Sequence, residues 1–325
     1  MKRTHINWGV IGCAGIADNA VIPAINNASN ANLYALASRN KDKLEKFKKK
    51  HNPFKTYEDY ERIIDDPEVD AVYIPLPNSM HYAWVLKAAE KKKHILCEKP
   101  MACTSKETLA MKEACERNGV ILMEGYAYRH SPVTLKLKEL IEQNAVGKVK
   151  LIETYLTFTL GDDGNIRAVK ELGGGAVYDV GCYSINIMRY LAGSEPVTIY
   201  ATGEIHSNAG VDWSCYGILN FEDNLKGMFH GAFNCPYRNE YKITGEKGVI
   251  QVPRGFNAEG ELEIIVQTGE KVETLIVSTP NNYLLEIEQF GRCVLEGERP
   301  RISMEESYRN ACVTDKVLQQ IFKPI

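Results

Sequence analysis

The stretch INWGVIGCAGIA, residues 6–17, joins a short apolar strand to a glycine-containing turn and the start of a helical pattern. It approximates the sequence G-x-G-x-x-G/A, in which glycines allow a tight turn and bring the backbone close to a pyrophosphate at a helix N-terminus. Ala14 replaces the second glycine. Such turns also occur in α/β proteins without a nucleotide, so the context must decide. We expect a dinucleotide-binding loop formed by Gly12, Cys13, Ala14, Gly15, Ile16 and Ala17.

The residues after this turn alternate between apolar strands and helical segments. Strands are predicted at residues 6–12, 33–38, 71–75, 94–98 and 120–124, and helices at 15–27, 41–50, 57–65, 79–92 and 105–118. Thr104 and Glu107 form a capping box before the last of these helices, and Gly119 ends it. This alternation predicts a parallel sheet with right-handed crossovers, hence an α/β Rossmann domain over residues 1–125.

The pattern changes after about Tyr126. A helix at 133–143 precedes a run of strands at 150–159, 197–206, 213–221, 226–233, 240–244, 249–252, 261–267 and 272–277. One helix at 179–191 interrupts this run, and helices return at 283–295 and 304–321. Consecutive strands predict a mostly antiparallel sheet in a second, α+β domain over residues 126–300, followed by a C-terminal segment over 301–325.

Composition and charge limit the classes of function. The 325 residues are 44% hydrophobic and 25% charged with a net charge of −3, which gives no reason to expect nucleic acid or an anionic membrane as partner. The lysines at 46–50 and 91–93 are interpreted as solvated helix ends. No run approaches the roughly 18 apolar residues of a membrane helix.

Cysteine and histidine usage points to a reduced protein without a metal. The nine cysteines form no C-x-x-C pair, and the seven histidines show no metal-ligand spacing, so no metal site is predicted. The apolar stretch at residues 6–12 is too short for a signal peptide. We therefore expect a cytoplasmic protein.

The end of the second strand bears on the choice of dinucleotide. An NAD site usually has an acid there for the ribose 2′-hydroxyl, whereas arginine accommodates a 2′-phosphate. Here Ser38 and Arg39 stand at that place, and no acid does. NADP is favoured and NAD is the alternative, unless Arg39 is only a surface residue.

The segment PLPNSMH, residues 75–81, follows the strand at 71–75. Its prolines prevent further strand pairing, and Asn78 or Ser79 can cap the next helix. The alternative is a position facing the nicotinamide. In that case the cofactor-binding residues of this segment are Pro75, Leu76, Asn78 and His81.

A lysine stands at the end of another buried strand. Pro100 biases Lys99 towards extended geometry, and ligands of open parallel sheets bind beyond the carboxyl ends of the strands. Most lysines after strands are solvated. In the functional interpretation, Glu98 and Lys99 are cofactor-binding residues and Lys99 also takes part in the chemistry.

The second domain contains GGGAVYDVGCY, residues 173–183. Three glycines enter a helix, and Asp179 and Tyr183 lie four residues apart on one helical face. A phenol exchanges protons usefully only if a nearby cation lowers its pKa, which Lys99 would do. The alternative is a helix-start aspartate with a core tyrosine.

In this order, the motifs resemble those of the glucose–fructose oxidoreductase / inositol dehydrogenase / rhizopine catabolism family of NAD(P)-dependent oxidoreductases. The resemblance rests on Gly12–Ala17, the P-N-x-x-H segment with Asn78 and His81, Glu98-Lys99-Pro100, Asn165-Ile166-Arg167 and Gly173–Tyr183. It covers essentially the whole chain. It implies a Rossmann domain plus a domain with a large open sheet, one face of which often makes the dimer, or a tetramer, and a C-terminal helix that packs on the first domain.

The resemblance also implies roles for single residues. Lys99 orients and polarises the substrate, Asp179 lies near it, and Tyr183 is the general acid/base, as in the tyrosine branch with xylose and dihydrodiol dehydrogenases. Arg167 contacts cofactor or substrate, and the Lys99–Pro100 bond is cis. Further pocket candidates are Tyr126, Arg129, His130 and Tyr283.

The predicted reaction is hydride transfer between the nicotinamide and a carbinol or carbonyl carbon of a sugar, polyol or dihydrodiol, held in a cleft between the domains. Two alternatives remain, namely a nucleotide-sensing regulator of the same fold and an NAD-dependent glycosidase. The sequence does not identify the particular sugar.

Overall fold

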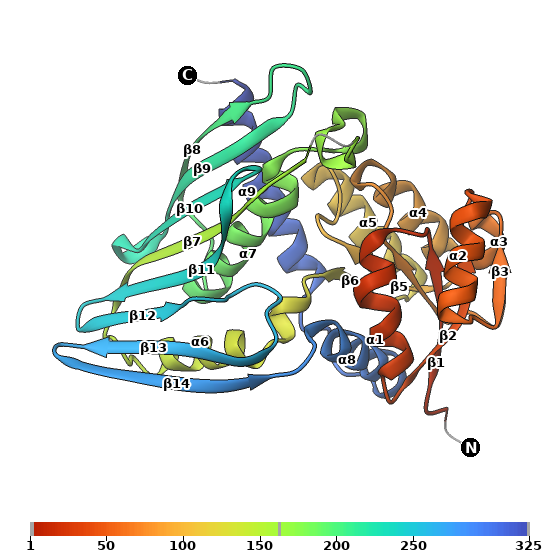
Figure 1. Cartoon of the computed structure of the whole chain (residues 1–325), viewed down its shortest axis with the longest axis horizontal. Coiled ribbons are helices and arrows are strands. Elements are labelled where there is room, and N and C mark those ends of the chain that lie inside the picture. The colour runs from red at the N-terminus through yellow and green to blue at the C-terminus, as the bar shows by residue number, and fades with distance from the viewer. Residues whose placement is uncertain (1–2, 162–163, 324–325) are drawn as a thin grey trace. The chain divides into compact units, whose positions relative to one another are not determined.

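The computed structural model describes residues 3–161 and 164–323, which form two compact units. Unit 1 contains the chain up to His130 together with Asn281–Tyr308, and unit 2 contains Ser131–Pro280 together with the chain from Arg309 onwards. Both units are drawn in Figure 1.

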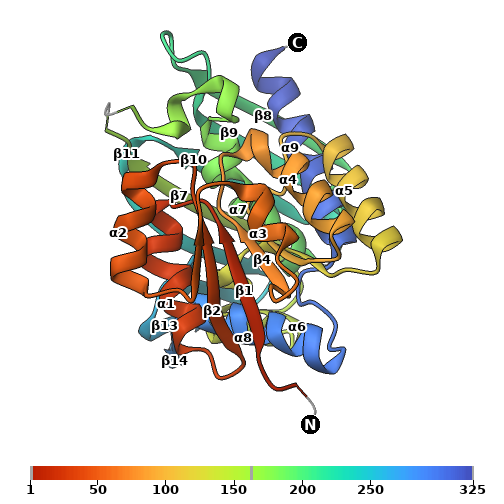
Figure 2. The same cartoon turned by 90° about the vertical axis from the view of Figure 1, so that its right-hand side faces the viewer.

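Unit 1 is built on a six-stranded parallel sheet. Its strands are β1 (Ile6–Ile11), β2 (Ala31–Ala37), β3 (Lys55–Tyr57), β4 (Ala71–Ile74), β5 (His94–Glu98) and β6 (Leu122–Gly125). They lie in the order β3-β2-β1-β4-β5-β6, and β1, β2 and β4 are seen side by side in Figure 2. All neighbouring pairs are parallel, so the predicted Rossmann fold is confirmed.

Most helices of unit 1 begin and end within a few residues of their predicted bounds. They are α1 (Ile22–Asn27), α2 (Lys41–His51), α3 (Tyr60–Asp65), α4 (Asn78–Glu90), α5 (Ser105–Asn118) and α8 (Asn282–Glu296). The Glu107 amide donates to the Thr104 hydroxyl at 3.1 Å, as the capping box predicts. Two of these helices differ from the prediction at their start. A π-helical turn at Ala17–Val21 precedes α1, and Asp59 caps α3 while residues 55–57 form the short strand β3 instead.

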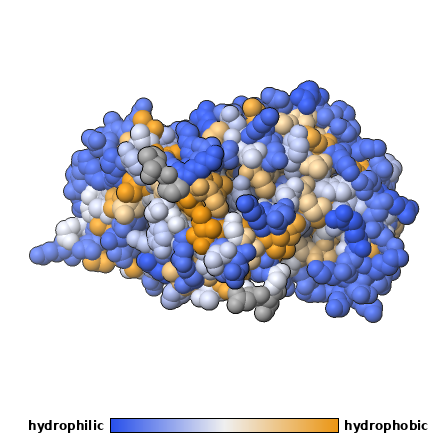
Figure 3. Space-filling model, turned by 90° about the horizontal axis from the view of Figure 1, so that it is seen from above, coloured by the Kyte–Doolittle hydropathy of each residue, from blue (hydrophilic) through white to orange (hydrophobic). Residues whose placement is uncertain are grey.

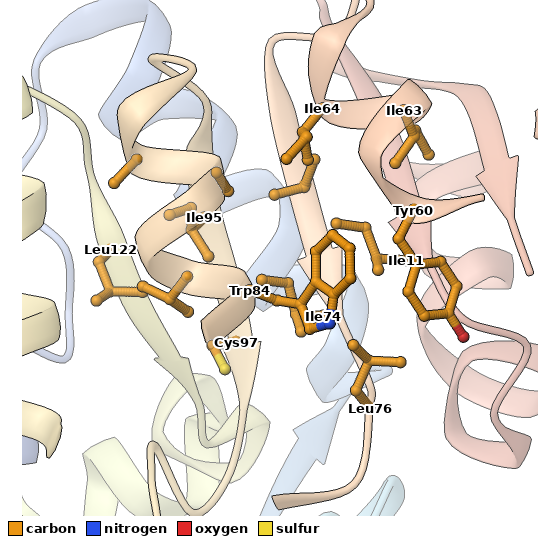
Figure 4. Close-up of a cluster of buried hydrophobic side chains, with 14 of the residues drawn as sticks. Ile11, Tyr60, Ile63, Ile64, Ile74, Leu76, Trp84, Ile95, Cys97 and Leu122 are labelled. Carbon is orange, nitrogen blue, oxygen red and sulfur yellow. The ribbon is translucent and has the colours of Figure 1, made fainter. Parts of the chain in front are cut away.

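Helices cover both faces of this sheet. On one face, α3, α4 and α5 pack on the strands around Trp84 and Tyr60, whose rings lie 5.1 Å apart (Figure 4). On the other face, Phe290 of α8 packs against Trp8 of β1 at 4.9 Å. Full burial of a large apolar side chain stabilises a fold by about 1.5–3 kcal/mol, so the packing of these rings stabilises both faces of the sheet.

Unit 2 is built on an eight-stranded sheet. Its strands are β7 (Val149–Thr159), β8 (Thr198–Ile205), β9 (Asp212–Asn220), β10 (Lys226–Ala232), β11 (Asn234–Gly245), β12 (Gly248–Val252), β13 (Gly260–Thr268) and β14 (Lys271–Thr279). The order is β14-β13-β12-β11-β7-β10-β9-β8. Among the described strands of this sheet, only β7 and β10 pair in parallel, so the predicted mostly antiparallel sheet is confirmed.

Helices lie on one face of the unit 2 sheet. They are α6 (Pro132–Glu142) and α7 (Cys182–Ala192), and Figure 1 shows both on the same side of the strands. A π-helical turn at Val177–Gly181 leads directly into α7. This turn carries Asp179 and therefore belongs to the site described below.

The unit boundaries differ from the predicted domain boundaries. Residues 281–300 belong to unit 1, because α8 packs on β1 and the Asn30 amide donates to the Glu288 carbonyl at 2.8 Å. The last helix, α9 (Met304–Phe322), belongs to unit 2 from Arg309 onwards, and Gln320 bonds the backbone of β8 at Ile199 and Ala201. The sequence order of elements does not reveal these long-range contacts.

One lysine interpreted as a solvated helix end is buried. Lys93 is 7% exposed, and its ammonium donates to the carbonyl oxygens of Asp66 at 2.6 Å and Val69 at 2.7 Å. Burial lowers the pKa of Lys93. The surface interpretation was therefore wrong for this residue, because its side chain completes the backbone hydrogen bonds of the loop before β4.

Candidate active site

The predicted cofactor residues of unit 1 follow the carboxyl ends of four neighbouring strands. The glycine turn follows β1, Ser38 and Arg39 follow β2, residues 75–81 follow β4, and Lys99 follows β5. In an open parallel sheet, ligands bind beyond this edge, where the strand order reverses. Here the order reverses between β1 and β4.

The glycine turn fits a pyrophosphate. Gly12 has φ +110°, and a Cβ there would lie 2.9 Å from Cδ2 of Leu76, so only glycine suits this position. A Cβ at Gly15 would meet no atom within 4 Å among the described residues, so space is open beside the turn. The Asp18 amide donates to the Ala14 carbonyl at 3.0 Å, which starts the helix. Ala14 therefore does not prevent the turn from forming.

Arg39 is supported by an aromatic ring that the sequence analysis did not single out. Its guanidinium carbon lies 5.0 Å from the centre of the Tyr60 ring. Ser38 is buried, and its hydroxyl accepts a hydrogen bond from the Asn40 amide at 3.2 Å. The Asn40 side chain in turn caps α2. The end of β2 thus presents an ordered arginine beside the glycine turn, as recognition of a 2′-phosphate requires.

The segment after β4 is organised by His81. Its Nε2 lies 2.8 Å from the Leu76 carbonyl oxygen, and its Nδ1 lies 2.9 Å from that of Pro100. His81 is fully buried, so it joins the loops after β4 and β5 rather than presenting a nitrogen to a ligand. Asn78 is the first residue of α4, and no side chain caps that helix, so the capping interpretation was wrong.

Lys99 stands on a loop held by two acids, the half-buried Glu98 and the buried Glu124. The Tyr73 hydroxyl donates to Oε1 of Glu98 at 2.6 Å, and the Met101 amide donates to Oε1 of Glu124 at 2.8 Å. Burial and the Glu98 charge raise the pKa of Tyr73 well above its usual value, so it stays a neutral donor. The Lys99–Pro100 bond is cis, as the resemblance implied.

The four pocket candidates of unit 1 have different surroundings. Arg129 pairs with Glu306 at 2.6 Å and is almost completely buried, and His130 lies 3.4 Å from the Gln289 side chain. Burial lowers the pKa of His130 to about 3, so its imidazole is neutral. Tyr126 is also fully buried, whereas Tyr283 is half-buried on α8. Tyr126, Arg129 and His130 stay predictions and take no part in the roles proposed below.

In unit 2, the three glycines make a close backbone crossing. The Gly174 and Gly175 amides donate to the carbonyls of Val169 and Arg167 at 3.0 and 2.9 Å. A Cβ at Gly174 would lie 2.5 Å from the Arg167 carbonyl oxygen. Gly175 has φ +122°, and a Cβ there would collide with the Asp212 carboxylate. Because these glycines have no side chains, residues 167–169 pack directly against the start of the next helix.

Asp212, which the sequence analysis missed, anchors that helix start. Its Oδ2 accepts a hydrogen bond from the Val177 amide at 2.6 Å, and it is 1% exposed. Burial raises its pKa to about 6 against the opposing effect of the backbone amides. Asp212 lies 37 positions after Gly175 in a strand, so no local pattern indicates this contact.

The same crossing brings Arg167 to Asp179. The Arg167 Nε donates to Oδ2 of Asp179 at 2.6 Å. Asp179 lies in the π-helical turn, which is wider than the α-helix that was predicted for it; single π turns inside helices often occur at functional sites. The structure thus gives Asp179 a cationic partner inside unit 2.

Tyr183 follows in the first turn of α7 and also has a partner that was not predicted. The Nδ2 amide of Asn257 donates to the Tyr183 hydroxyl at 3.3 Å. The Tyr183 ring packs edge-on against Phe256 at 5.2 Å. The residues 253–258 come between two short strands, and nothing in their sequence marks them as part of a site.

Metal-ligand clusters, disulfides and membrane-spanning helices are absent from the described parts of the chain. Within residues 3–161 and 164–323, no group of three His, Cys, Asp or Glu side chains could hold a metal ion. All nine cysteines carry free thiols. Among the described helices, none is long and apolar enough to cross a membrane, and hydrophobic residues are interspersed with hydrophilic ones on the face shown in Figure 3.

Comparison with known proteins identifies the class of these folds. Residues 6–126 match the model of an oxidoreductase family with an NAD-binding Rossmann fold, and residues 134–251 match the GFO/IDH/MocA C-terminal domain. The two matches together span most of the chain. The chain belongs to the GFO/IDH/MocA oxidoreductase family, as its motifs predicted.

Individual relatives are similar over nearly their full length. The chain is 35% identical to D-xylose 1-dehydrogenase (NADP(+)) 2 of Haloferax volcanii, with 92% of each chain covered. It is 31% identical to trans-1,2-dihydrobenzene-1,2-diol dehydrogenase of Xenopus tropicalis, with 97% of each covered. The solved structure of KijD10, a 3-ketoreductase from Actinomadura kijaniata in complex with NADP and TDP-benzene, is 25% identical with a TM-score of 0.92 and 97% of each chain covered. These relatives confirm the prediction of an NAD(P)-dependent oxidoreductase.

Proposed function

We propose that this protein transfers a hydride between NADP(H) and a carbinol or carbonyl carbon of a sugar, polyol or dihydrodiol. The observation that carries the proposal is the segment from Arg167 to Tyr183, where the glycine crossing, the Asp179 ion pair and the Asn257 contact hold an acid and a phenol in fixed places. Relatives that act on xylose and on a dihydrodiol support the substrate class.

The roles follow from the chemistry of the side chains. Tyr183 exchanges the proton of the substrate oxygen, and the Lys99 ammonium stabilises the alkoxide that develops there. Asp179, oriented by Arg167, accepts a hydrogen bond from a substrate hydroxyl. Lys99 belongs to unit 1 and the other two to unit 2, so their action on one substrate is part of the proposal.

The cofactor is proposed to bind beyond the carboxyl edge of the unit 1 sheet. The turn Gly12–Ala17 would hold the pyrophosphate, Ser38 and Arg39 the 2′-phosphate, and the loops at 75–78 and 98–99 the nicotinamide half. When bound, the nicotinamide supplies or accepts the hydride. His81 would fix the last two loops relative to each other.

A substrate screen tests this function. Purified protein is mixed with NADP+ or NAD+ and a panel of aldoses, polyols and dihydrodiols, and with NADPH and ketosugars in the reverse direction, while absorbance at 340 nm is followed. We expect NADP(H)-dependent turnover of at least one polyhydroxylated compound. Binding of NADPH without any turnover would instead support a nucleotide-sensing regulator, and a copurifying NAD(H) that free sugars never oxidise or reduce would support the glycosidase.

We also propose that a second copy of the chain covers the open face of the unit 2 sheet. Tyr200 of β8, Tyr216 and Ile218 of β9 and Met228 of β10 are 62%, 42%, 39% and 42% exposed on that face. They line an apolar depression of about 560 Å³. Exposed apolar patches of this kind mark protein interfaces. A cytoplasmic location stays a prediction.

The mass of the protein in solution tests the proposed association of two or four chains. By light scattering we expect twice or four times the chain mass of 36.5 kDa, and the single-chain mass for Ile218→Glu. The matched control is Thr274→Glu on β14, outside this depression. A wild-type protein of single-chain mass would reject the proposed dimer.

A further inference from the structure

The loop at residues 253–258 is built around a single asparagine. Asn257 has φ 47°, in the left-handed region that asparagine tolerates better than most residues. Its Nδ2 donates to the Tyr183 hydroxyl at 3.3 Å. Its Oδ1 is buried and has no hydrogen-bond partner in the described parts of the chain. A buried amide oxygen without a partner is costly, so its retention calls for a functional reason.

The rest of the loop is rigidly held. Asn239 of β11 bonds Phe256 twice, donating to its carbonyl at 2.7 Å and accepting from its amide at 2.6 Å. Phe256 packs edge-on against Tyr241 at 4.6 Å and against Tyr183 at 5.2 Å. A Cβ at Gly255 would lie 2.4 Å from the Tyr241 ring, so the backbone also touches that ring. These contacts fix Asn257 beside Tyr183.

We propose that Asn257 is a substrate-binding residue, whose Nδ2 holds the Tyr183 hydroxyl while its Oδ1 accepts a hydrogen bond from a second hydroxyl of the substrate. The inference rests on the proposed function, in which Tyr183 exchanges the proton of the reacting oxygen. The contact at Asn257 Oδ1 restricts the substrate class to compounds with a hydroxyl next to the reacting carbon. A donor to the phenol oxygen also stabilises the phenolate form of Tyr183, which suits a proton acceptor.

The test compares a vicinal diol substrate with its deoxy analogue, which lacks the neighbouring hydroxyl. Wild type should prefer the diol by roughly tenfold or more in kcat/KM, since one net hydrogen bond contributes about 1–1.5 kcal/mol. In Asn257→Gly, which keeps the left-handed backbone available, this preference should fall to near one through a higher KM for the diol. If Asn257→Gly keeps the wild-type preference, the substrate contact is rejected.

The matched control is Asn224→Gly. Asn224 also has a left-handed φ of 62° but lies on an exposed turn between β9 and β10, so the same substitution there should change neither kcat nor KM. An equal effect of both substitutions would reject a specific role for Asn257.

A second measurement does not depend on turnover. Asn257→Asp places a carboxylate, which cannot donate, beside the phenol. The absorbance of ionising tyrosine is titrated in this variant and in wild type, each minus the same protein carrying Tyr183→Phe. The Tyr183 step should occur at higher pH in Asn257→Asp, and an unchanged step would overturn the contact. If wild type oxidises nothing in the screen, the proposed function fails, while this titration still decides whether Asn257 holds Tyr183.

Discussion

The Arg167 Nε atom lies 2.6 Å from Oδ2 of Asp179, so a charged pair joins the segment before the three glycines to the π-helical turn after them. The Arg167 side chain is 40% exposed and that of Asp179 14%, so the carboxylate is the more shielded partner. Surface ion pairs contribute little to stability. We therefore interpret this pair as a device that orients Asp179.

Replacement of Arg167 tests this interpretation. We expect Arg167→Ala to lower kcat/KM by about 10- to 100-fold, because small misplacements of an orienting group have effects of that size. Arg167→Lys should recover only part, since an ammonium lacks the planar donor pair of a guanidinium. Steady-state kinetics give the change. Lys170→Ala removes an exposed cation from the same segment and should leave the kinetics unchanged, and full activity of Arg167→Ala would contradict the assignment.

Replacement of Lys99 and of Lys93 should affect different properties of the protein, namely turnover for Lys99 and stability for Lys93. Lys99→Ala should retain NADP(H) binding yet lose most turnover, by about 100-fold or more, because its charge stabilises the developing alkoxide. Lys93→Ala should keep kcat but unfold at a lower temperature, since it removes two hydrogen bonds from a charged donor to backbone carbonyls, and such bonds contribute about 1.5–3 kcal/mol each. Fluorescence titration with NADPH, kinetics and thermal melting separate the two. Full turnover of Lys99→Ala would reject its catalytic role.

Arg39 should determine the preference of the protein for NADPH over NADH. We expect Arg39→Ala to weaken NADPH by roughly tenfold or more and NADH little, because only NADPH carries the 2′-phosphate. Tyr60→Phe keeps the ring under the guanidinium and should change neither affinity, whereas Tyr60→Leu removes the ring face and should weaken NADPH. The dissociation constants are measured by fluorescence. Equal losses for NADPH and NADH in Arg39→Ala would contradict the phosphate assignment.

The sequence could predict those parts of the fold that depend on local signals. The glycine turn, the strand–helix alternation and the cap at Thr104 each follow from neighbouring residues, and the structure has all three. The motif GGGAVYDVGCY, residues 173–183, likewise predicted Asp179 and Tyr183 as candidate site residues.

What could not be predicted depends on long-range contacts. Lys93 is buried by a loop from a different part of unit 1, and Asp212 reaches Val177 from a distant strand. Asn257 meets Tyr183 only because β11 and β12 bring its loop to the start of α7. Side chains that act through such contacts carry no periodic or spacing signal in one sequence.

Asp212 gives a stability prediction whose sign depends on pH. Its folded pKa of about 6 lies above the ordinary aspartate value of 3.8, so the folded state binds this proton more tightly than the unfolded state does. The stability that this proton contributes is fully present below the ordinary pKa and is lost as pH rises through about 6. In Asp212→Asn the side chain is an amide, which binds no proton in this pH range.

The free energy of unfolding of wild type should therefore fall relative to that of Asp212→Asn between pH 5 and pH 8, by about 1.4 kcal/mol, the equivalent of one pKa unit. Urea unfolding of both proteins at several pH values measures this difference, from which all other titrating groups cancel. Ser214→Ala, at a buried position two residues further along β9, is the control and should show a constant difference from wild type. A difference between wild type and Asp212→Asn that stays flat, or that grows in favour of wild type with pH, would show that the amides of residues 176 and 177 outweigh burial and keep the Asp212 carboxylate ionised.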